Sequence, residues 1–493
     1  RDVERSRGLG DVYKRQDANI IGHVLDKNSE EHLPYITIAL KGTTIGTVTD
    51  ATGHYFLKNL PEGNFVMEVS SVGYKTITRS VTLKKGKTLE ENFELEEDAI
   101  ALDGVVVSAN RNETTRRMAP TLVNVVDLKL FESTNSSTLS QGLNFQPGVR
   151  VETNCQNCGF QQVRINGLDG PYTQILIDSR PVFSALSGVY GLEQIPASMI
   201  ERVEVMRGGG SALFGSSAIA GTINIITKEP LRNSGQLSHT ITGFSGGNSF
   251  DNNTSLNLSL VTDDHRAGVY IFGQNRHRSG YDYDGDGFTE LPKLKNQTVG
   301  FRSYFKTSTY SKLTFEYHHL QEFRRGGDML NRPPHEANIA EQLEHAIDGG
   351  SLKFDYFSPN EKHRFSVFTS AANTDRDSYY GGGQDPNAYG KTTDFTVMGG
   401  TQYMYSFGRC LFMPADLTAG LEYNRDHLED NMWGYNRHTE QTVNIYSGFL
   451  QNEWKNEKWG ILLGGRLDKH NMVDHVIFSP RANPVSYTHL TLP

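Results

Sequence analysis

Three aspartates at alternate positions mark one stretch of the sequence for cation chemistry. The acidic residues of the run YDYDGDGFTELP are Asp282, Asp284, Asp286 and Glu290. The three aspartates and Gly287 are the residue types at positions 1, 3, 5 and 6 of an EF-hand calcium loop. Position 12, which needs a bidentate glutamate, is Lys293, so the glutamate of this run would have to compensate. Neighbouring carboxylates repel unless a cation or solvent separates them, so the run predicts either a calcium site or a solvated acidic loop.

A second group of candidates combines arginine and histidine within residues 323–350. The candidates for ligand binding there are Arg324, Arg325, His335 and His345. A guanidinium pairs well with an anionic chelate, and an imidazole suits a metal ion or haem; a solvated lid is the alternative. We expect a short helix over 337–347 within this stretch. Because no HExxH motif, phosphate-binding loop or pair of catalytic carboxylates is evident, we expect the protein not to be an enzyme.

The elements that must position these residues are short segments in which apolar and polar side chains alternate. Leu256, Leu258 and Leu260, for example, are separated by polar residues. Alternation over about ten residues is expected of strands that cross a membrane as a barrel. The expected strands are 235–244, 254–262, 266–277, 296–306, 311–320, 350–357, 363–371, 394–407, 416–425, 443–455 and 458–469, with a twelfth from about Ser479. Short and long connections alternate between them, as they do between periplasmic turns and extracellular loops of bacterial barrels.

Length and charge restrict the class of protein further. A chain of 493 residues is too long for one ordinary domain. It contains no run of about 18 apolar residues of the kind that forms a membrane-spanning helix. The net charge of −9 argues against nucleic acid as a partner. The 49 glycines, 22 tyrosines and 25 phenylalanines suit the turns and aromatic girdles of a membrane barrel.

The stretch 199–230, MIERVEVMRGGGSALFGSSAIAGTINIITKEP, organises the chain. Val203 and Val205 alternate with charged residues, a run of three glycines permits positive φ, and an apolar strand closes the unit. This stretch resembles the C-terminal part of the plug domain of TonB-dependent outer-membrane transporters, although Gly209 stands where that family usually has proline. GTVTDATGHYFLKNLPEGNF (46–65) resembles a carboxypeptidase regulatory-like domain, which precedes the plug in Bacteroidetes-type transporters.

The resemblance implies a mainly β chain located in the cell outer membrane, with its first domain and plug on the periplasmic side. The implied parts are a transthyretin-like β-sandwich (17–98), a linker (99–117), a mixed α/β plug (118–230) and part of an antiparallel transmembrane β-barrel (231–484). Eleven or twelve strands are the first half of a 22-stranded plugged barrel, so we expect the chain to be a fragment of a longer protein. DVYKRQ and VSYTHLTLP resemble translated sequencing-adapter sequence, so residues 1–16 and 485–493 are expected to be non-native tails; genuine tails are the alternative.

LDGVVVSANR (102–111) resembles a TonB box, the segment that engages the energy-transducing complex in the periplasm. The residues implied are Asp103, Gly104, Val105, Val106, Val107, Ser108 and Ala109. An extended apolar segment between two modules can pair with the edge of a partner's sheet through main-chain hydrogen bonds. An ordinary first strand of the plug is the alternative interpretation.

Cys155 and Cys158 form a CxxC pair, and the third cysteine, Cys410, is remote. A structural zinc site needs four ligands and a redox pair needs a βαβ setting, and the sequence shows neither. In the oxidising periplasm or at the cell surface a disulfide is the better interpretation, with a reduced, inert pair as the alternative. In the family, plug loops at this place face the extracellular ligand, so Gln156 and Asn157 are further candidates for substrate contact.

The resemblance implies energy-coupled import of a scarce metal chelate, a ferric siderophore first, with haem or cobalamin behind it. The implied partners are the TonB–ExbB–ExbD complex, outer-membrane lipid, the chelate and a surface lipoprotein. No cofactor is required, and calcium in the acidic loop is the one candidate ion. One rival is SusC-like glycan import, but that branch usually reads Lys-Asp where this chain has Met206 and Arg207. Others are an adhesin or signalling receptor on the same scaffold and a peptidase, which only the name of the N-terminal domain suggests.

Overall fold

The computed structural model describes most of the chain. The described residues are 18–71, 73–97, 105–112, 114–155, 157, 159–181, 196–244 and 249–486. Four predicted site residues, Asp103, Gly104, Gln156 and Cys158, lie outside them. The chain divides into two compact units, and along the sequence the boundary falls between Gly104 and Val105.

The first unit is a sandwich of two β-sheets, as its short strands and frequent turns predict. One sheet has the order β4-β1-β7, with β8 also pairing with β1, and the other has the order β3-β2-β5-β6. The strands are β1 (Ala18–Asp26), β2 (Thr37–Leu40), β3 (Gly46–Val48), β4 (His54–Leu60), β5 (Gly63–Ser70), β6 (Ile77–Leu83), β7 (Thr88–Glu90) and β8 (Phe93–Leu95). Alternate side chains enter one common core, so that Tyr55 and Leu57 are buried while Phe56 is exposed.

The second unit begins with a mixed α/β domain, the plug, built around a four-stranded sheet of order β11-β15-β16-β14. Its strands are β9 (Val105–Val106), β10 (Thr114–Thr115), β11 (Val123–Asp127), β12 (Val149–Cys155), β13 (Phe160–Ile165), β14 (Thr173–Ile177), β15 (Ile200–Arg207) and β16 (Gly221–Thr227). Its helices are α1 (Leu128–Ser133), α2 (Leu139–Leu143), α4 (Ser211–Phe214) and the short 3-10 turns η1 (Arg116–Met118), η2 (Gly170–Tyr172), η3 (Ala197–Met199) and η4 (Ser216–Ala218). Val203 and Val205 of β15 lie in the plug core. Gly208 and Gly209 have φ of 63° and 62°, which confirms the expected glycine turn.

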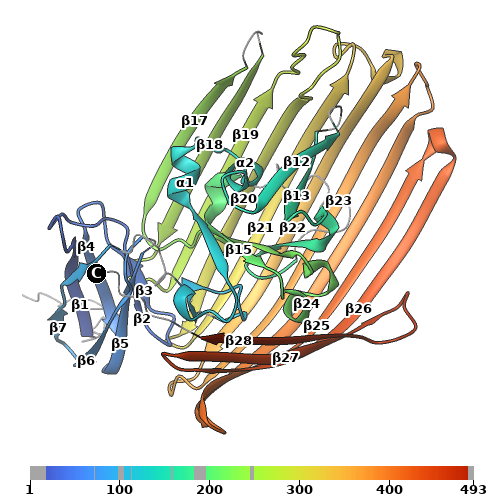
Figure 1. Ribbon diagram of the computed structural model, residues 1–493. Coiled ribbons are helices and arrows are strands. Elements are labelled where there is room, and N and C mark those ends of the chain that lie inside the picture. The colour runs from blue at the N-terminus through green and yellow to red at the C-terminus, as the bar shows by residue number, and fades with distance from the viewer. Residues whose placement is uncertain are drawn as a thin grey trace, which may run out of the picture. The chain divides into compact units, whose positions relative to one another are not determined.

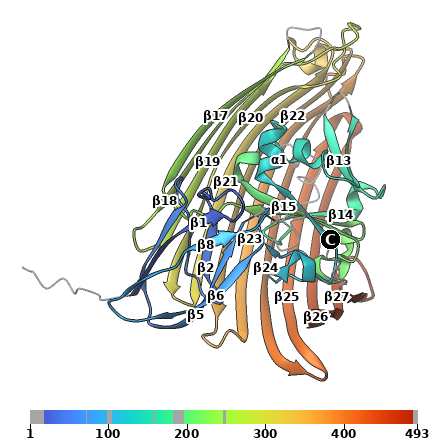
Figure 2. The same cartoon turned by 60° about the vertical axis from the view of Figure 1, so that its left-hand side comes forward.

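Twelve antiparallel strands form one continuous sheet, which we call the wall, and each strand pairs with the next in the sequence. The strands are β17 (Ser234–Gly243), β18 (Phe250–Val261), β19 (Ala267–Arg278), β20 (Lys293–Ser308), β21 (Ser311–Gly327), β22 (Ile339–Phe357), β23 (His363–Gly382), β24 (Tyr389–Cys410), β25 (Met413–Met432), β26 (Arg437–Lys455), β27 (Trp459–His470) and β28 (Ile477–Ser486). Leu256, Leu258 and Leu260 are exposed while Asn257 and Ser259 between them are buried, which confirms the predicted alternation. Figures 1 and 2 show the wall curving around the plug.

Several strands extend beyond their predicted bounds, and the helix expected over 337–347 is wrong. Except for its first two residues, that stretch belongs to β22, which pairs with both β21 and β23. Buried Ala340, Leu343 and Ile347 stand at positions i, i+3 and i+7, which is the spacing of one face of a helix. In the strand, Leu343, His345 and Ile347 are buried and Glu344 is exposed, so the alternation is present but places a polar histidine on the buried face. The connections expected at 372–393 and 426–442 shrink to 383–388 and 433–436, because the flanking strands continue beyond their predicted bounds.

Helical structure in the wall is confined, among the described residues, to two 3-10 turns in its connections. These are η5 (Pro334–Glu336) and η6 (Trp433–Tyr435). No helix in the described part of the chain has the length and apolar character needed to span a membrane.

Candidate functional site

Residues 105–112, which include the described part of the predicted energy-coupling segment, are docked inside the second unit. Its strand β9 pairs antiparallel with β10. Val106, Ser108 and Ala109 are each 0% exposed, and the two apolar ones pack in a cluster with Met206 of β15. The segment that the sequence marks as a sticky strand is therefore covered in this state.

One buried carboxylate holds the backbone of this segment. Glu204 of β15 is 0% exposed, and its Oε2 accepts hydrogen bonds from the N–H groups of Val107 and Ser108, each at 2.9 Å. The same oxygen accepts the Ser108 hydroxyl at 2.7 Å, and the Ser108 oxygen in turn accepts the Asn224 amide at 3.0 Å. The other oxygen, Oε1, accepts Arg202 Nε at 3.0 Å. An ionised acceptor makes hydrogen bonds about twice as strong as a neutral one, so Glu204 is the main polar anchor of the segment.

The wall holds the next residues of the segment through their carbonyl oxygens. Arg481 of β28 donates to Ala109 O at 2.8 Å, and Gln451 of β26 donates to Asn110 O at 2.7 Å. The Asn110 side-chain amide donates a hydrogen bond to a carboxylate oxygen of Glu453 of β26 at 2.5 Å. The segment thus bridges the plug sheet and the inner face of the wall.

Arg111 is the charged end of this docking contact. Its guanidinium pairs with Glu422 of β25, which also accepts a hydrogen bond from Arg466 of β27 at 2.7 Å. The guanidinium also lies between the rings of Phe214 and Phe449, 4.7 Å from each centroid. Removing one partner of a buried ion pair leaves an uncompensated charge, so separating Arg111 from Glu422 is costly.

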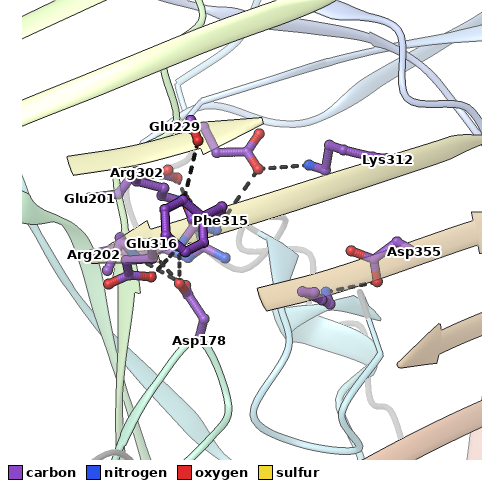
Figure 3. Close-up of polar contacts among 12 residues, drawn as sticks. Asp178, Glu201, Arg202, Glu229, Arg302, Lys312, Phe315, Glu316 and Asp355 are labelled. Atoms are coloured by element: carbon purple, nitrogen blue, oxygen red, sulfur yellow. Dashed lines mark hydrogen bonds and ion pairs between the residues drawn. The ribbon is translucent and has the colours of Figure 1, made fainter. Parts of the chain in front are cut away.

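A second charged contact joins the plug to the wall (Figure 3). Arg302 of β20 pairs with Asp178, which follows β14, and lies 3.3 Å from a carboxylate oxygen of Glu316. Lys312 of β21 donates to Glu229, which follows β16, at 2.7 Å. The nearby Lys312 ammonium lowers the pKa of Glu229 to about 2, so this carboxylate is ionised. These five residues, which we call the Arg302 cluster, fix the ends of two plug strands to the wall.

Some of the predicted substrate-contact residues meet at the tip of the β12–β13 hairpin. Arg324 of β21 is 1% exposed and donates to Gly159 O of the hairpin at 3.2 Å and to Glu322 at 2.7 Å. His345 of β22 lies beside the same glutamate, with Nδ1 3.6 Å from Oε1. The structure therefore brings Arg324 and His345 together on the inner face of the wall, although the sequence placed both in a loop.

The hairpin tip touches the wall at two further points. A Cβ added to Gly326 would lie 1.8 Å from Asn157 O, so only a glycine fits there without movement. Cys155 Sγ donates to Glu341 at 3.1 Å. Since Cys158 lies outside the described residues, its disulfide with Cys155 stays a prediction.

Arg325 and His335 lie apart from this group. Arg325 donates to the main-chain oxygen of Asp328 at 3.0 Å, and His335 Nδ1 lies 2.8 Å from the Tyr389 hydroxyl. Each of these side chains already has a protein partner, so an anionic ligand would have to replace that partner. Their role in substrate contact stays a prediction.

The acidic residues of the connection 279–292 converge as the sequence indicates. One carboxylate oxygen from each of Asp282, Asp284, Asp286 and Glu290 lies within 4.8 Å of the others. Both oxygens of Asp282 accept N–H groups of loop glycines, at 2.7 and 2.9 Å. Such a set of oxygens is what Ca²⁺ prefers, and Glu290 contributes the fourth carboxylate of the set. Calcium binding itself stays a prediction.

Several docking residues were not foreseen from the sequence. They are Glu204, Arg302, Glu422, Glu453, Arg466 and Arg481. For the five residues of the wall, the available signal was their position on inward-facing sites of alternating strands, where a charged side chain must find a partner; for Glu204 it was the place of a carboxylate between two buried valines. Alternation shows which face of the strand a residue occupies, but it does not show which residue it contacts. The sequence could therefore identify these residues as inward-facing but could not predict their partners.

Comparison with known proteins agrees with this architecture. Residues 20–107 match the family model of the CarboxypepD_reg-like domain, and residues 115–222 match that of the TonB-dependent Receptor Plug Domain. The vitamin B12 transporter BtuB of Vibrio vulnificus (strain CMCP6) is 37% identical over 125 residues, which are 25% of this chain and 20% of that protein.

Two solved structures show a similar fold. The siderophore receptor PirA from Acinetobacter baumannii has a TM-score of 0.64 at 18% identity, covering 76% of this chain and 60% of that chain. A mutant of the ferric enterobactin receptor PfeA from Pseudomonas aeruginosa has a TM-score of 0.64 at 18% identity, covering 74% and 59%. This chain thus spans about 60% of the length of the solved receptors that it matches.

A mixed α/β plug against the inner face of a long antiparallel wall is the fold that this chain shares with the solved receptors. The family models place two domains within the chain. It contains a plug domain of the TonB-dependent receptor type, preceded in the sequence by a CarboxypepD_reg-like domain.

Proposed function

We propose that this receptor imports a scarce metal chelate, a ferric siderophore first, and that the TonB–ExbB–ExbD complex supplies the energy. The observation that carries the proposal is the docked segment 105–112, in which the short strand β9 is followed by a turn whose N–H groups, at Val107 and Ser108, are held by Glu204. The solved receptors of similar fold are a siderophore receptor and a ferric enterobactin receptor, which supports a chelate as the cargo.

The docked contacts suggest how coupling works. A partner that adds a strand needs main-chain N–H groups, and those of Val107 and Ser108 are occupied by Glu204. Pairing with TonB and docking on Glu204 therefore exclude each other. Once TonB holds the released segment, the pull acts on Arg111, whose buried ion pair with Glu422 connects the segment to the wall. The plug would then rearrange to open a path.

Deletion of residues 103–109 tests the coupling step. We expect uptake of the ligand to be lost and ligand binding to be retained, because the hairpin tip and the wall residues stay in place. A matched control is deletion of residues 384–387, which lie in the connection between β23 and β24 and are not part of segment 105–112 or of its contacts described above. If the 103–109 deletion leaves uptake unchanged, the proposed coupling is wrong. If the unaltered protein binds the ligand but does not transport it, an adhesin or signalling receptor is favoured.

Cobalamin is the second candidate cargo, because the relative that is 37% identical over 125 residues is a vitamin B12 transporter. A titration of the purified protein with ferric siderophores, haem, cobalamin and oligosaccharides separates the candidates. Trp433 in η6 is 60% exposed and serves as the fluorescent reporter, with Trp433→Phe as the control for its signal. Saturable quenching by an iron chelate supports the proposal, whereas quenching by cobalamin or by oligosaccharide alone changes the assigned cargo.

A further inference from the structure

Three histidines of the first unit lie together, and none of them takes part in the site described above. His23 on β1 and His54 on β4 are cross-strand neighbours, and His32 lies in the connection that follows β1. The ring centroids of His23 and His32 are 5.2 Å apart, those of His23 and His54 5.8 Å, and those of His32 and His54 4.9 Å. His32 and His54 are exposed and His23 is half-buried, so an ion from solvent can reach all three rings.

The backbone builds this group. Gly53 has φ of +76°, and a Cβ at this position would lie 2.8 Å from the His32 Cβ. A side chain there would push His32 away from His54. Val24, the neighbour of His23, donates to Gly53 O at 3.0 Å and accepts the N–H of Leu33 at 2.8 Å, so the three segments are joined by main-chain hydrogen bonds.

Hydrogen bonding leaves the rings ready to act as ligands. His54 Nδ1 lies 3.0 Å from the carbonyl oxygen of Thr52. A carbonyl can only accept, so Nδ1 carries the hydrogen and the lone pair of the neutral ring is on Nε2. A backbone carbonyl that fixes the tautomer in this way is the usual outer partner of a metal-bound histidine. The rings of His23 and His32 have no hydrogen-bond partner among the described residues, so their nitrogens are also available.

We propose that His23, His32 and His54 bind one divalent transition-metal ion, such as Zn²⁺, each through one imidazole nitrogen. Imidazole is a preferred ligand of Zn²⁺, Cu²⁺ and Ni²⁺, and three histidines with a water molecule complete a tetrahedral zinc site. At Zn–N distances of about 2.0–2.1 Å the ring centroids of three such ligands lie about 5 Å apart. The observed centroid separations are 4.9 to 5.8 Å, and the rings of His32 and His54 are stacked with an angle of 25° between their planes, so a ring must turn before both can bind one ion.

Binding requires rotation of the imidazole rings. Among the described residues only the acidic group at 282–290 has ligand atoms that already converge, so the ligand nitrogens of the three histidines do not yet face one point. His54 is held by the Thr52 carbonyl, whereas the rings of His23 and His32 turn about their own side-chain bonds. The backbone positions stay as they are.

Metal binding to the purified full chain in detergent tests this proposal. Zn²⁺ is measured by equilibrium dialysis, and Co²⁺ by the visible absorption of a tetrahedral complex, both with millimolar calcium present to occupy the acidic connection. The test variant is His23→Gln/His32→Gln/His54→Gln. We expect it to bind one equivalent of Zn²⁺ less than the unaltered protein and to lose the tetrahedral Co²⁺ absorption.

A matched variant controls for the other histidines. It replaces three exposed histidines of the wall with glutamine, namely His239, His438 and His475. This control should retain both the Zn²⁺ equivalent and the Co²⁺ absorption. The single variant His32→Gln, in an exposed connection, guards against misfolding and should also lose the tetrahedral absorption. If the triple variant at 23, 32 and 54 keeps the equivalent and the absorption, the proposal is overturned.

Discussion

Replacing Glu204 with glutamine tests whether one carboxylate holds the coupling segment in place. Glu204→Gln keeps the size and shape of the side chain and removes its charge. The Oε2 atom of Glu204 accepts three hydrogen bonds from the segment, two from the N–H groups of Val107 and Ser108 and one from the Ser108 hydroxyl. The substitution therefore weakens these bonds while the apolar packing of Val106 and Ala109 remains.

The size of the effect follows from the change in acceptor. A hydrogen bond to a charged group contributes about 1.5–3 kcal/mol, and one between neutral groups about 0.5–1.5 kcal/mol. The loss is about 1 kcal/mol per bond, or about 3 kcal/mol for the three bonds if their contributions add. Since about 1.4 kcal/mol corresponds to a factor of ten, local opening of the segment should become roughly 100-fold more frequent.

Amide hydrogen–deuterium exchange of the purified protein measures this opening directly. Exchange at Val107 and Ser108 should accelerate by that factor in Glu204→Gln, while exchange in β16 stays unchanged. The matched control is Glu201→Gln on the same strand, whose side chain is 49% exposed and pairs with Arg202. Unchanged exchange at both residues of the segment in Glu204→Gln would refute the assignment of Glu204 as the anchor.

Three further predictions concern the contacts of the plug and the acidic connection. Because the pKa of Glu229 is lowered from 4.5 to about 2 in the folded protein, its pairing with Lys312 stabilises the fold above pH 4.5 and is lost as the pH falls toward 2. The melting temperature of the unaltered protein should therefore fall more steeply over that range than that of Glu229→Gln, and parallel curves would contradict the pairing. Asp284→Asn should weaken Ca²⁺ binding in calorimetric titration, and equal binding by both proteins would contradict the calcium prediction. Gly326→Val should displace the hairpin tip, because a Cβ there would lie 1.8 Å from Asn157 O, and faster proteolysis of the hairpin would report it; unaltered cleavage would show that this contact does not hold the tip.

The strands of the wall were predictable because two solvents act on their two faces. A side chain such as Leu258 faces lipid and its neighbour Asn257 faces the interior, so hydrophobicity itself has the period of the strand. All twelve strands were found for this reason. The same rule failed at 337–347, because buried Ala340, Leu343 and Ile347 recur there at the spacing of a helical face. Hydrogen bonds to the neighbouring strands, which no single segment reveals, keep β22 extended there.

The docking contacts were less accessible, since they join residues far apart in the sequence. Asn110 and Glu453, for example, are separated by 343 positions. The alternation of apolar and polar residues shows which face of a strand a side chain occupies, but not how far along the wall it lies. That position depends on the register between all the strands of the wall. Glu204 nevertheless carried a usable signal, because it stands between two buried valines of one strand. A buried carboxylate is costly unless it finds donors, and the main-chain N–H groups of a turn that packs against the strand are donors of the right kind. A carboxylate that stands between two buried apolar residues of a plug strand therefore predicts that donors from another segment dock on it, even where that segment cannot be identified from the sequence.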